Sequence, residues 1–313
     1  MLRVVLALCL AGTVAVAQES RTAAPSRELV LSAQVMLDAA GFSPGEIDGR
    51  AGANFARALA GFQQSRGLGA SGRLDDATAE RLGQEFGQPT LVAYALTEAD
   101  VAGPFQPNIP GDLVEQSKLP SLDYRNPLEA LAEKFHASPA LLQSLNPDRT
   151  FMQAGEQITV PNVLPSEAAA PTKATRTPGT RIVVTKKTSA LTVEDANGRV
   201  LFFAPVTTGS EHDPLPVGMW KVTGVQQLPV FHYNPDLFWD ASPAHSKAKI
   251  PPGPNNPVGV AWIDLSKPHY GIHGTPEPSK IGHVQSHGCV RMTNWDVTRV
   301  LEWARPGMLV VFQ

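Results

Sequence analysis

The chain reads Ser286-His287-Gly288-Cys289-Val290-Arg291-Met292 close to its C-terminus. Another histidine, His273, precedes this stretch in Gly271-Ile272-His273-Gly274-Thr275. A thiol with histidines and glycines nearby suits covalent thiol catalysis, because a histidine must generate or hold the nucleophilic thiolate. These residues predict that Cys289 is a nucleophile and that the C-terminal part of the chain is catalytic.

The other cysteine lies in an N-terminal leader pattern. Met1-Leu2-Arg3 begins an apolar run that contains Cys9, and Ala15-Val16-Ala17 matches the small-x-small pattern of signal-peptide cleavage. We expect residues 1–17 to be removed, which leaves Cys289 as the lone thiol of an exported protein. Because export permits disulfides, an unpaired thiol there indicates chemistry. A buried, inert cysteine is the alternative.

Composition predicts a globular protein with more than one domain. The chain has 313 residues, of which 42% are hydrophobic and 18% charged, as is usual for globular proteins. A net charge of -3 gives no reason to expect binding to nucleic acid or to an anionic membrane. The apolar run from Val4 to Val16 is shorter than the roughly 20 residues that span a bilayer. We therefore expect a periplasmic or cell-wall protein that does not span the membrane.

Residues 26–87 are predicted to form a small helical module. Apolar residues recur at helical spacing in its sequence, Gly41 and Gly67 end two of the helices, and another begins near Asp75 or Asp76. The pattern resembles the peptidoglycan-binding domain 1 family. The matching residues are Gln34, Leu37, Gly41, Gly45, Ile47-Asp48-Gly49, Gly52, Ala58, Phe62-Gln63, Gly67-Leu68, Gly72, Leu74, Thr78 and Leu82. The alternative is that these residues only build a three-helix bundle.

The middle of the chain contains a proline-rich stretch and a second small module. Residues 88–120 are predicted to be an irregular connector. Residues 121–162 resemble the second half of a LysM domain, with two helices, Asn146-Pro147 and a short strand ending at Pro161. The expected first strand and its Gly-Asp-Thr-Leu signature are missing from that segment, so a spacer and a glycan-binding role both stay open. Residues 163–180 have the composition of a linker.

Residues 181–313 predict a mainly antiparallel β domain with one helix. Strand patterns occur at residues 181–184, 191–193, 200–203, 219–225, 258–265 and 308–312. Asn197-Gly198 is a strong signal for a two-residue hairpin. Thr293 is expected to cap the helix, with Asp296 forming an acidic variant of the capping box.

The strand pattern predicts how the reactive side chains are displayed. In an extended strand over residues 268–274, His269 and His273 would share one face. His287 and Cys289 would likewise share a face if their segment were extended.

The groups around the thiol predict how it would be activated. Cys289 shortly precedes the expected helix N-terminus at Thr293, whose dipole would lower the pKa of the thiol. Gly288 carries no side chain, so a substrate carbonyl can approach the backbone amides there, which are the natural oxyanion donors.

The two histidine-containing motifs together resemble the L,D-transpeptidase (YkuD) family. The likeness includes Pro216-Val217-Gly218 and the stretch from Pro251 to Gly259, and it extends over roughly residues 181–313. It implies a β-sandwich-like catalytic domain that performs cysteine acyl transfer on peptidoglycan stem peptides, with no metal or other cofactor. The whole chain would then be multidomain, with an all-α three-helix module, a short α+β LysM-like module and this β domain.

The resemblance also implies roles for individual residues. Cys289 would attack the carbonyl between the diamino acid and the terminal D-alanine of a stem tetrapeptide. His273 would be the general base, oriented by the backbone carbonyl of Gly274. His287, with the amides of Gly288 and Cys289, would serve the oxyanion.

Two further residues are expected to contact the substrate. Arg291 would hold a carboxylate, because a guanidinium fork matches that group; an exposed ion pair with Asp296 is the alternative. Ser286 is placed with Arg291 among the substrate-binding residues, although its hydroxyl can instead shape the turn.

The acceptor determines the product, and the sequence leaves it open. A diamino-acid amine gives a 3-3 cross-link, a protein amine anchors that protein to the wall, and water gives L,D-carboxypeptidase activity. Two other classes of protein remain as alternatives. A zinc hydrolase would use His273, His287 and Cys289 as ligands, and a non-catalytic wall-binding protein would carry a relict transpeptidase domain.

Overall fold

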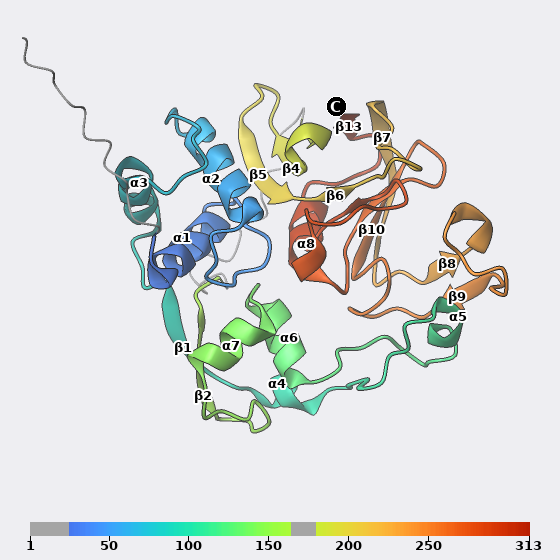
Figure 1. Cartoon of the computed structure of the whole chain (residues 1–313), viewed down its shortest axis with the longest axis horizontal. Coiled ribbons are helices and arrows are strands. Elements are labelled where there is room, and N and C mark those ends of the chain that lie inside the picture. Colours follow the sequence, from blue (N-terminus) through green and yellow to red (C-terminus); the bar gives the residue numbers. More distant parts are fainter. Residues whose placement is uncertain (1–24, 164–179) are drawn as a thin grey trace, which may run out of the picture.

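The structure is a computed structural model that describes residues 25–163 and 180–313. The predicted signal peptide with Cys9 and nearly all of the predicted linker lie outside these described residues. Figure 1 shows a β-rich C-terminal part beside two smaller, mainly helical parts, and the chain between them passes along one side of the molecule to reach the far end of the β-rich part. None of the helices in the described residues is long and apolar enough to cross a bilayer.

The predicted N-terminal three-helix module is present. It consists of α1 (Arg27–Ala39), α2 (Ala53–Ser65) and α3 (Asp76–Phe86). The side chain of Ser26 caps α1 and that of Asp75 caps α3, each by accepting from a backbone N–H of the first turn. The apolar faces of the helices meet in a core that includes Leu37, Leu59 and Phe62.

The second module begins earlier in the chain than the sequence predicts. Its elements are β1 (Leu91–Ala95), α4 (Glu98–Ala102), α6 (Pro127–Lys134), α7 (Pro139–Leu145) and β2 (Gln157–Pro161), while α5 (Leu113–Gln116), which lies between α4 and α6 in the chain, packs against the β-rich part instead. Strand β1 lies in the stretch predicted to be irregular, and it pairs antiparallel with β2. It therefore supplies the first strand that seemed missing from the LysM-like segment. Its signal is weak because the strand is short, partly exposed and paired with a distant segment.

The β-rich part is built on one nine-stranded sheet in the order β5-β4-β3-β13-β7-β10-β11-β12-β6. The strands are β3 (Arg181–Thr185), β4 (Ala190–Glu194), β5 (Val200–Pro205), β6 (Thr207–Thr208), β7 (Gly218–Gln227), β10 (Ala261–Leu265), β11 (Gly271–His273), β12 (Val290–Arg291) and β13 (Leu309–Phe312). Only the β13–β3 and β11–β12 pairs among these strands are parallel. Helix α8 (Asn294–Leu301) packs with residues from both halves of the sheet in one core, so the predicted mainly antiparallel domain with a helix is confirmed.

The remaining short elements lie between these strands. A separate two-stranded sheet pairs β8 (Phe231–Tyr233) with β9 (Ala248–Ile250), and the 3₁₀ turns are η2 (Lys186–Thr188), η3 (Pro235–Leu237) and η4 (Pro278–Lys280). The loop of the β4–β5 hairpin is longer than the predicted two residues. Within it, the backbone N–H of Asp195 donates to the Arg199 carbonyl, and the N–H of Gly198 donates to the Asp195 carbonyl. Gly198 adopts φ +79° there, which favours glycine.

The N-terminal module is joined to the β-rich part by backbone hydrogen bonds. Ser43 donates its N–H to the Phe203 carbonyl and Phe203 donates to the Gly41 carbonyl, both at 2.9 Å. Phe203 also belongs to the core of the helical module. The edge strand β5 is therefore covered by this module and not exposed for pairing with another chain.

All three parts of the molecule meet at helix α8. Arg299 pairs with buried Asp38 of α1 at 2.9 Å, and the ring of His136, between α6 and α7, stacks on Trp295 with centroids 5.3 Å apart. Thr293 caps α8 by accepting from the backbone of Asp296, as predicted. The carboxyl of Asp296 does not complete a capping box. It accepts instead from Ser43 Oγ at 3.0 Å.

We expect Asp296→Asn to stabilise the protein at neutral pH. Burial first, and the nearby charge of Asp38 second, raise the pKa of Asp296 to about 6. In the unfolded chain the group titrates near 4, so folding becomes less favourable as pH rises from about 4 to about 6, and the full cost remains above that range. Asparagine avoids the cost, which is about 3 kcal/mol for a shift of about two pKa units. The melting temperatures of the wild type and of Asp296→Asn, measured from pH 4 to pH 8, should be similar at pH 4 and should differ at neutral pH. Equal melting temperatures at every pH would contradict the prediction.

Candidate active site

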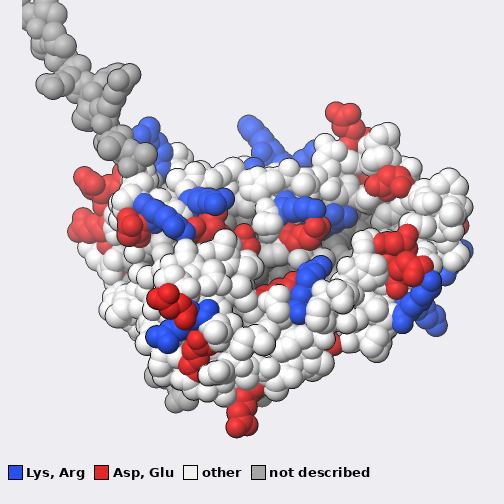
Figure 2. All heavy atoms as spheres, turned by 60° about the horizontal axis from the view of Figure 1, so that its bottom comes forward, with Lys and Arg blue, Asp and Glu red and all other residues white. Residues whose placement is uncertain are grey.

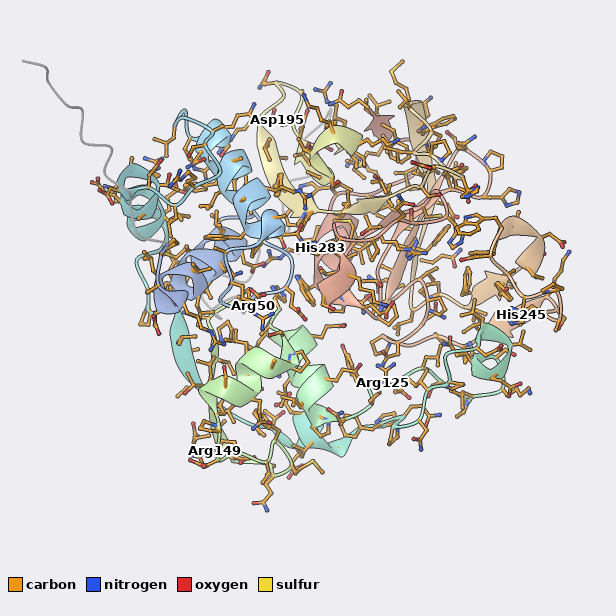
Figure 3. All side chains as sticks on the ribbon, viewed as in Figure 1. Arg50, Arg125, Arg149, Asp195, His245 and His283 are labelled. Atoms are coloured by element: carbon orange, nitrogen blue, oxygen red, sulfur yellow. The ribbon has the colours of Figure 1, made fainter. Side chains whose placement is uncertain are left out.

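The predicted reactive residues line one cavity of about 1020 Å³. Cys289, His273, His287 and Arg291 all lie on its wall. Part of the remaining wall comes from distant parts of the chain, namely the β8–β9 region and the segment from Ile109 to Arg125, which sequence reasoning treated largely as a connector. Figure 3 shows Arg125 between α6 and the catalytic sheet and His245 beside α5, at the two ends of that segment.

The connector is held against the β8–β9 region by specific contacts. Asp112 caps α5 and also accepts from His245 Nε2 at 3.0 Å. His245 Nδ1 lies 2.9 Å from the hydroxyl of Tyr233. Leu122, Tyr233 and Ile250 form a small buried cluster between the same two segments. The connector is thus a structured wall of the cavity.

Parallel pairing of β11 with β12 brings the two motifs together. His273 lies opposite Arg291 and Ile272 opposite Val290. The residues before β12 are not extended, contrary to expectation, since Gly288 has φ +97°. A Cβ at Gly288 would come within 2.7 Å of the Tyr270 ring, so this turn requires glycine both for its backbone conformation and for space.

The strand that carries His273 is also shorter than predicted. His269 has φ +67°, so it lies in a turn before β11 and does not continue the face of His273. Its backbone carbonyl nevertheless contributes to the site, because it lies 3.7 Å from Cys289 Sγ. The thiol therefore donates its hydrogen to a carbonyl oxygen.

Cys289 is held as a neutral thiol. The prediction that the helix dipole lowers its pKa is wrong, because burial raises the pKa of Cys289 more than Gly271 and Arg291 lower it. Desolvation disfavours the thiolate, and β12 separates the cysteine from the first turn of α8.

His273 is buried and neutral, with one nitrogen committed to the backbone. Its Nδ1 lies 2.7 Å from the carbonyl oxygen of Gly274, the contact that the family resemblance implies. A carbonyl only accepts, so Nδ1 carries the hydrogen and Nε2 keeps its lone pair. Burial, followed by the charge of Arg291, lowers the pKa of His273 to about 3. Trp262 stacks on the ring with centroids 5.3 Å apart, which fixes its plane.

His287 is oriented by an acidic residue that sequence reasoning missed. Its Nε2 lies 2.8 Å from Asp240 Oδ1, and the rings of Phe238 and Trp239 lie beside it. Its Nδ1 is buried without a hydrogen-bond partner. Asp240 comes from the turn between β8 and β9, 47 residues earlier in the chain, and no local pattern links it to the motif.

Arg291 is a partly buried cation with unused hydrogen-bonding capacity. Its Nε is buried without a partner, and no ion pair within residues 25–163 and 180–313 includes it. Burial lowers the pKa of Arg291, which reflects the cost of holding this charge away from water. The alternative pairing with Asp296 is excluded, because Asp296 is fully buried against Ser43.

Three other predicted site residues, Gly274, Ser286 and Gly288, are not among the residues that line the cavity. Ser286 is buried, and its hydroxyl donates to the Cys289 carbonyl at 2.6 Å, so it shapes the turn and is not on the cavity wall.

In the described part of the chain, no group of three or more histidine, cysteine or acidic side chains is arranged to hold a metal ion. Figure 2 shows acidic and basic side chains interspersed on one face of the molecule, without a field of a single sign.

Comparison with known proteins matches both ends of the chain. The family model for the L,D-transpeptidase catalytic domain matches residues 179–312, and a putative peptidoglycan binding domain matches residues 26–82. The putative L,D-transpeptidase YkuD of Bacillus subtilis is 30% identical over 171 residues, which cover 54% of this chain and 83% of the relative.

Two further matches come from the same family. The putative L,D-transpeptidase YqjB of Bacillus subtilis is 30% identical over 136 residues, covering 42% of this chain and 69% of the relative. A solved L,D-transpeptidase from Mycobacterium smegmatis matches at 17% identity and a TM-score of 0.35. That match covers 43% of this chain, and the chain spans 58% of the solved structure.

Proposed function

The chain belongs to the L,D-transpeptidase (YkuD) family of enzymes, and we propose that it is an exported cysteine acyltransferase acting on peptidoglycan stem peptides. The most direct support is that three side chains line one cavity. They are Cys289, His273 with its free Nε2, and Arg291, which has no ion pair among the described residues. A nucleophile, a base and a carboxylate-binding group are what transfer of a peptide acyl group requires.

Acylation begins from two neutral partners. As Cys289 Sγ attacks the carbonyl that precedes the terminal D-alanine, its proton passes to His273 Nε2. The tetrahedral intermediate collapses by breaking the C–N bond, and the imidazolium returns the proton to the departing D-alanine amine. A thioester on Cys289 remains.

The second half-reaction reverses these proton movements. A diamino-acid amine attacks the thioester and gives a proton to His273, and the thiol leaves with that proton. The product is a 3-3 cross-link. Water in place of the amine gives a carboxylate, and an amine on a protein gives a wall-anchored protein.

Three groups are assigned to the negative oxygen of the intermediate. The first two are the backbone N–H groups of Gly288 and Cys289, which adjoin the nucleophilic sulfur in the chain. His287 can donate from Nδ1 when that nitrogen carries a hydrogen, and its ring is held in place by the contact of Nε2 with Asp240.

Incubation with purified disaccharide-tetrapeptide, followed by mass spectrometry, tests the proposal. A transpeptidase gives a cross-linked dimer that has lost one D-alanine, whereas a carboxypeptidase gives disaccharide-tripeptide alone. A folded protein that yields neither product, and forms no covalent adduct with a carbapenem, would contradict acyl transfer at Cys289.

We expect Arg291→Ala to lower kcat/KM on the tetrapeptide by about 30-fold or more, because losing one partner of a buried charged pair costs roughly 2–5 kcal/mol. The melting temperature should change little, since Arg291 has no ion pair to lose within the described residues. Arg291→Lys should recover part of the loss, because lysine keeps the charge without the bidentate fork. A lower melting temperature with unchanged kcat/KM would instead make Arg291 a structural residue.

The N-terminal module is proposed to hold the enzyme on the wall. We expect the full chain with Cys289→Ala to sediment with insoluble peptidoglycan, and a chain beginning at Thr180 with the same substitution to stay largely in solution. Because the shorter chain loses contacts to Gly41, Ser43 and Asp38, circular dichroism must show that it is folded at the temperature used. Equal sedimentation of the two folded proteins would make the module a spacer.

A further inference from the structure

The LysM-like segment reaches the catalytic domain through a carboxylate on α6. Glu133 Oε1 and Oε2 lie 3.2 and 3.0 Å from Nδ2 of Asn294, the first residue of α8. The hydroxyl of Tyr124 donates to the same carboxylate at 2.8 Å. Asn294 is 1% exposed, so this contact is made inside the molecule.

The amide of Asn294 has a single possible orientation. Its Nδ2 also donates to the Pro254 carbonyl at 3.1 Å, while its Oδ1 accepts from the backbone N–H groups of Val260 and Thr275, both at 3.1 Å. A backbone carbonyl only accepts and backbone amides only donate. Reversing the amide would therefore break the hydrogen bonds with Pro254, Val260 and Thr275.

The oxygen of Asn294 is packed against the loop that orients His273. A Cβ at Gly259 or at Gly274 would come within 2.0 and 2.2 Å of Oδ1, respectively. Thr275, which donates to that oxygen, directly follows Gly274, whose carbonyl accepts from His273 Nδ1 at 2.7 Å. The position of the Gly274 carbonyl thus depends on where Asn294 is held.

The docking of α6 is fixed by further contacts from the chain just before this helix. Leu122 donates to the Pro252 carbonyl and accepts from the Asn255 N–H, both at 2.9 Å, and Arg125 donates to Asn255 Oδ1 at 2.9 Å. Figure 3 shows Arg125 at this junction, between α6 and the catalytic sheet. Glu133 is therefore placed by an ordered interface and not by a chance surface contact.

We propose that Glu133 is a positioning residue for His273, acting through Asn294 and the Gly274–Thr275 loop. The inference rests on the proposed role of His273 as general base. It means that the catalytic site of this chain is completed by a side chain from the LysM-like segment, whether or not that segment binds glycan.

The test compares variants of the full chain. Glu133→Leu removes both acceptor oxygens, and Glu133→Gln keeps one that can accept from Asn294. Lys134→Ala is the matched control, because it removes the neighbouring ion pair with Asp100 of α4, which does not involve Asn294. Acylation by a carbapenem is followed by mass spectrometry over a range of concentrations, which separates the binding constant from the rate constant of adduct formation.

We expect Glu133→Leu to slow adduct formation by up to about a hundredfold, with a smaller change in the binding constant. Glu133→Gln should lie between Glu133→Leu and the wild type, and Lys134→Ala should keep the wild-type rate. An unchanged rate in Glu133→Leu, or an equal loss in Lys134→Ala, would overturn the proposal. If Glu133→Leu does not fold, an unchanged rate in Glu133→Gln overturns it.

Nitrogen-15 NMR of the histidines provides a second readout that does not depend on turnover. The His273 signals, assigned with His273→Gln, should report hydrogen on Nδ1 in the wild type and a shifted or mixed tautomer in Glu133→Leu. Unchanged His273 signals in that variant would overturn the positioning role. A wild type that forms no adduct would overturn the proposed function, while the NMR comparison would still decide the role of Glu133.

Discussion

Cys289→Ala is expected to abolish both turnover and covalent labelling while leaving the fold intact. The sulfur is the atom that bonds to the acyl carbon, and alanine offers no replacement for it. The side chain is partly exposed at the cavity wall, and its recorded hydrogen bond is a long one to the His269 carbonyl. Removing the sulfur therefore takes a hydrogen-bond partner from the His269 carbonyl, and water can reach that carbonyl from the cavity.

The measurement combines a carbapenem with intact-protein mass spectrometry. β-Lactams mimic the acyl donor, so the wild type should gain one adduct mass and Cys289→Ala none. The control is the melting temperature, which should differ little between the two proteins. Turnover of the tetrapeptide by a folded Cys289→Ala variant would end the assignment of this residue as the nucleophile.

Much of the fold could be predicted because its signals are local. Helical spacing with capping residues such as Ser26 and Asp75 marks the N-terminal helices, and alternating or continuous apolar runs mark the strands. Strand β1 was missed because it is defined by pairing with β2, which lies more than 60 residues later. A five-residue strand with partial exposure carries almost no periodicity of its own.

The same distinction applies to the site. The motifs around His273 and Cys289 are contiguous, so the sequence identifies them as candidates. Asp240, Asn294 and Glu133 matter because the fold brings them to these motifs, and none of them has a motif of its own. The sequence also did not predict that the two small modules pack against α8. A composition typical of a linker describes the chain between domains, but it does not indicate which surfaces of those domains are in contact.

The direction of the thiol pKa shows why burial must be known. From the sequence, a cysteine shortly before a helix N-terminus is expected to be acidic. In the folded protein desolvation outweighs the favourable charges, and the pKa of Cys289 is raised. The pKa of His273 is lowered for the same reason. The resting pair is therefore a thiol and a neutral imidazole, and the proton moves when the substrate is attacked.

This resting state predicts how the rate of acylation depends on pH. With a pKa of about 3, His273 binds a proton only in strong acid and remains a competent base at pH 5. The rate should therefore not fall between pH 7 and pH 5 on account of this residue, whereas a base with the ordinary histidine pKa near 6.5 would be largely protonated at pH 5. His273→Gln should be slow at every pH in this range, because glutamine has no basic nitrogen to accept the thiol proton.

The size of that loss follows from the role of His273. A positioned general base contributes roughly two to four orders of magnitude, and a thiol whose pKa is raised depends on it more than a thiol that is already ionised. We therefore expect His273→Gln and His273→Ala to lower kcat by about a hundredfold to ten-thousandfold. Because His273 is buried under Trp262, the glutamine variant is the better measure, since alanine also opens a cavity beside the ring. Near-normal acylation by a folded His273→Gln variant would transfer the role of base to His287, which also lines the cavity and whose Nδ1 is buried without a hydrogen-bond partner.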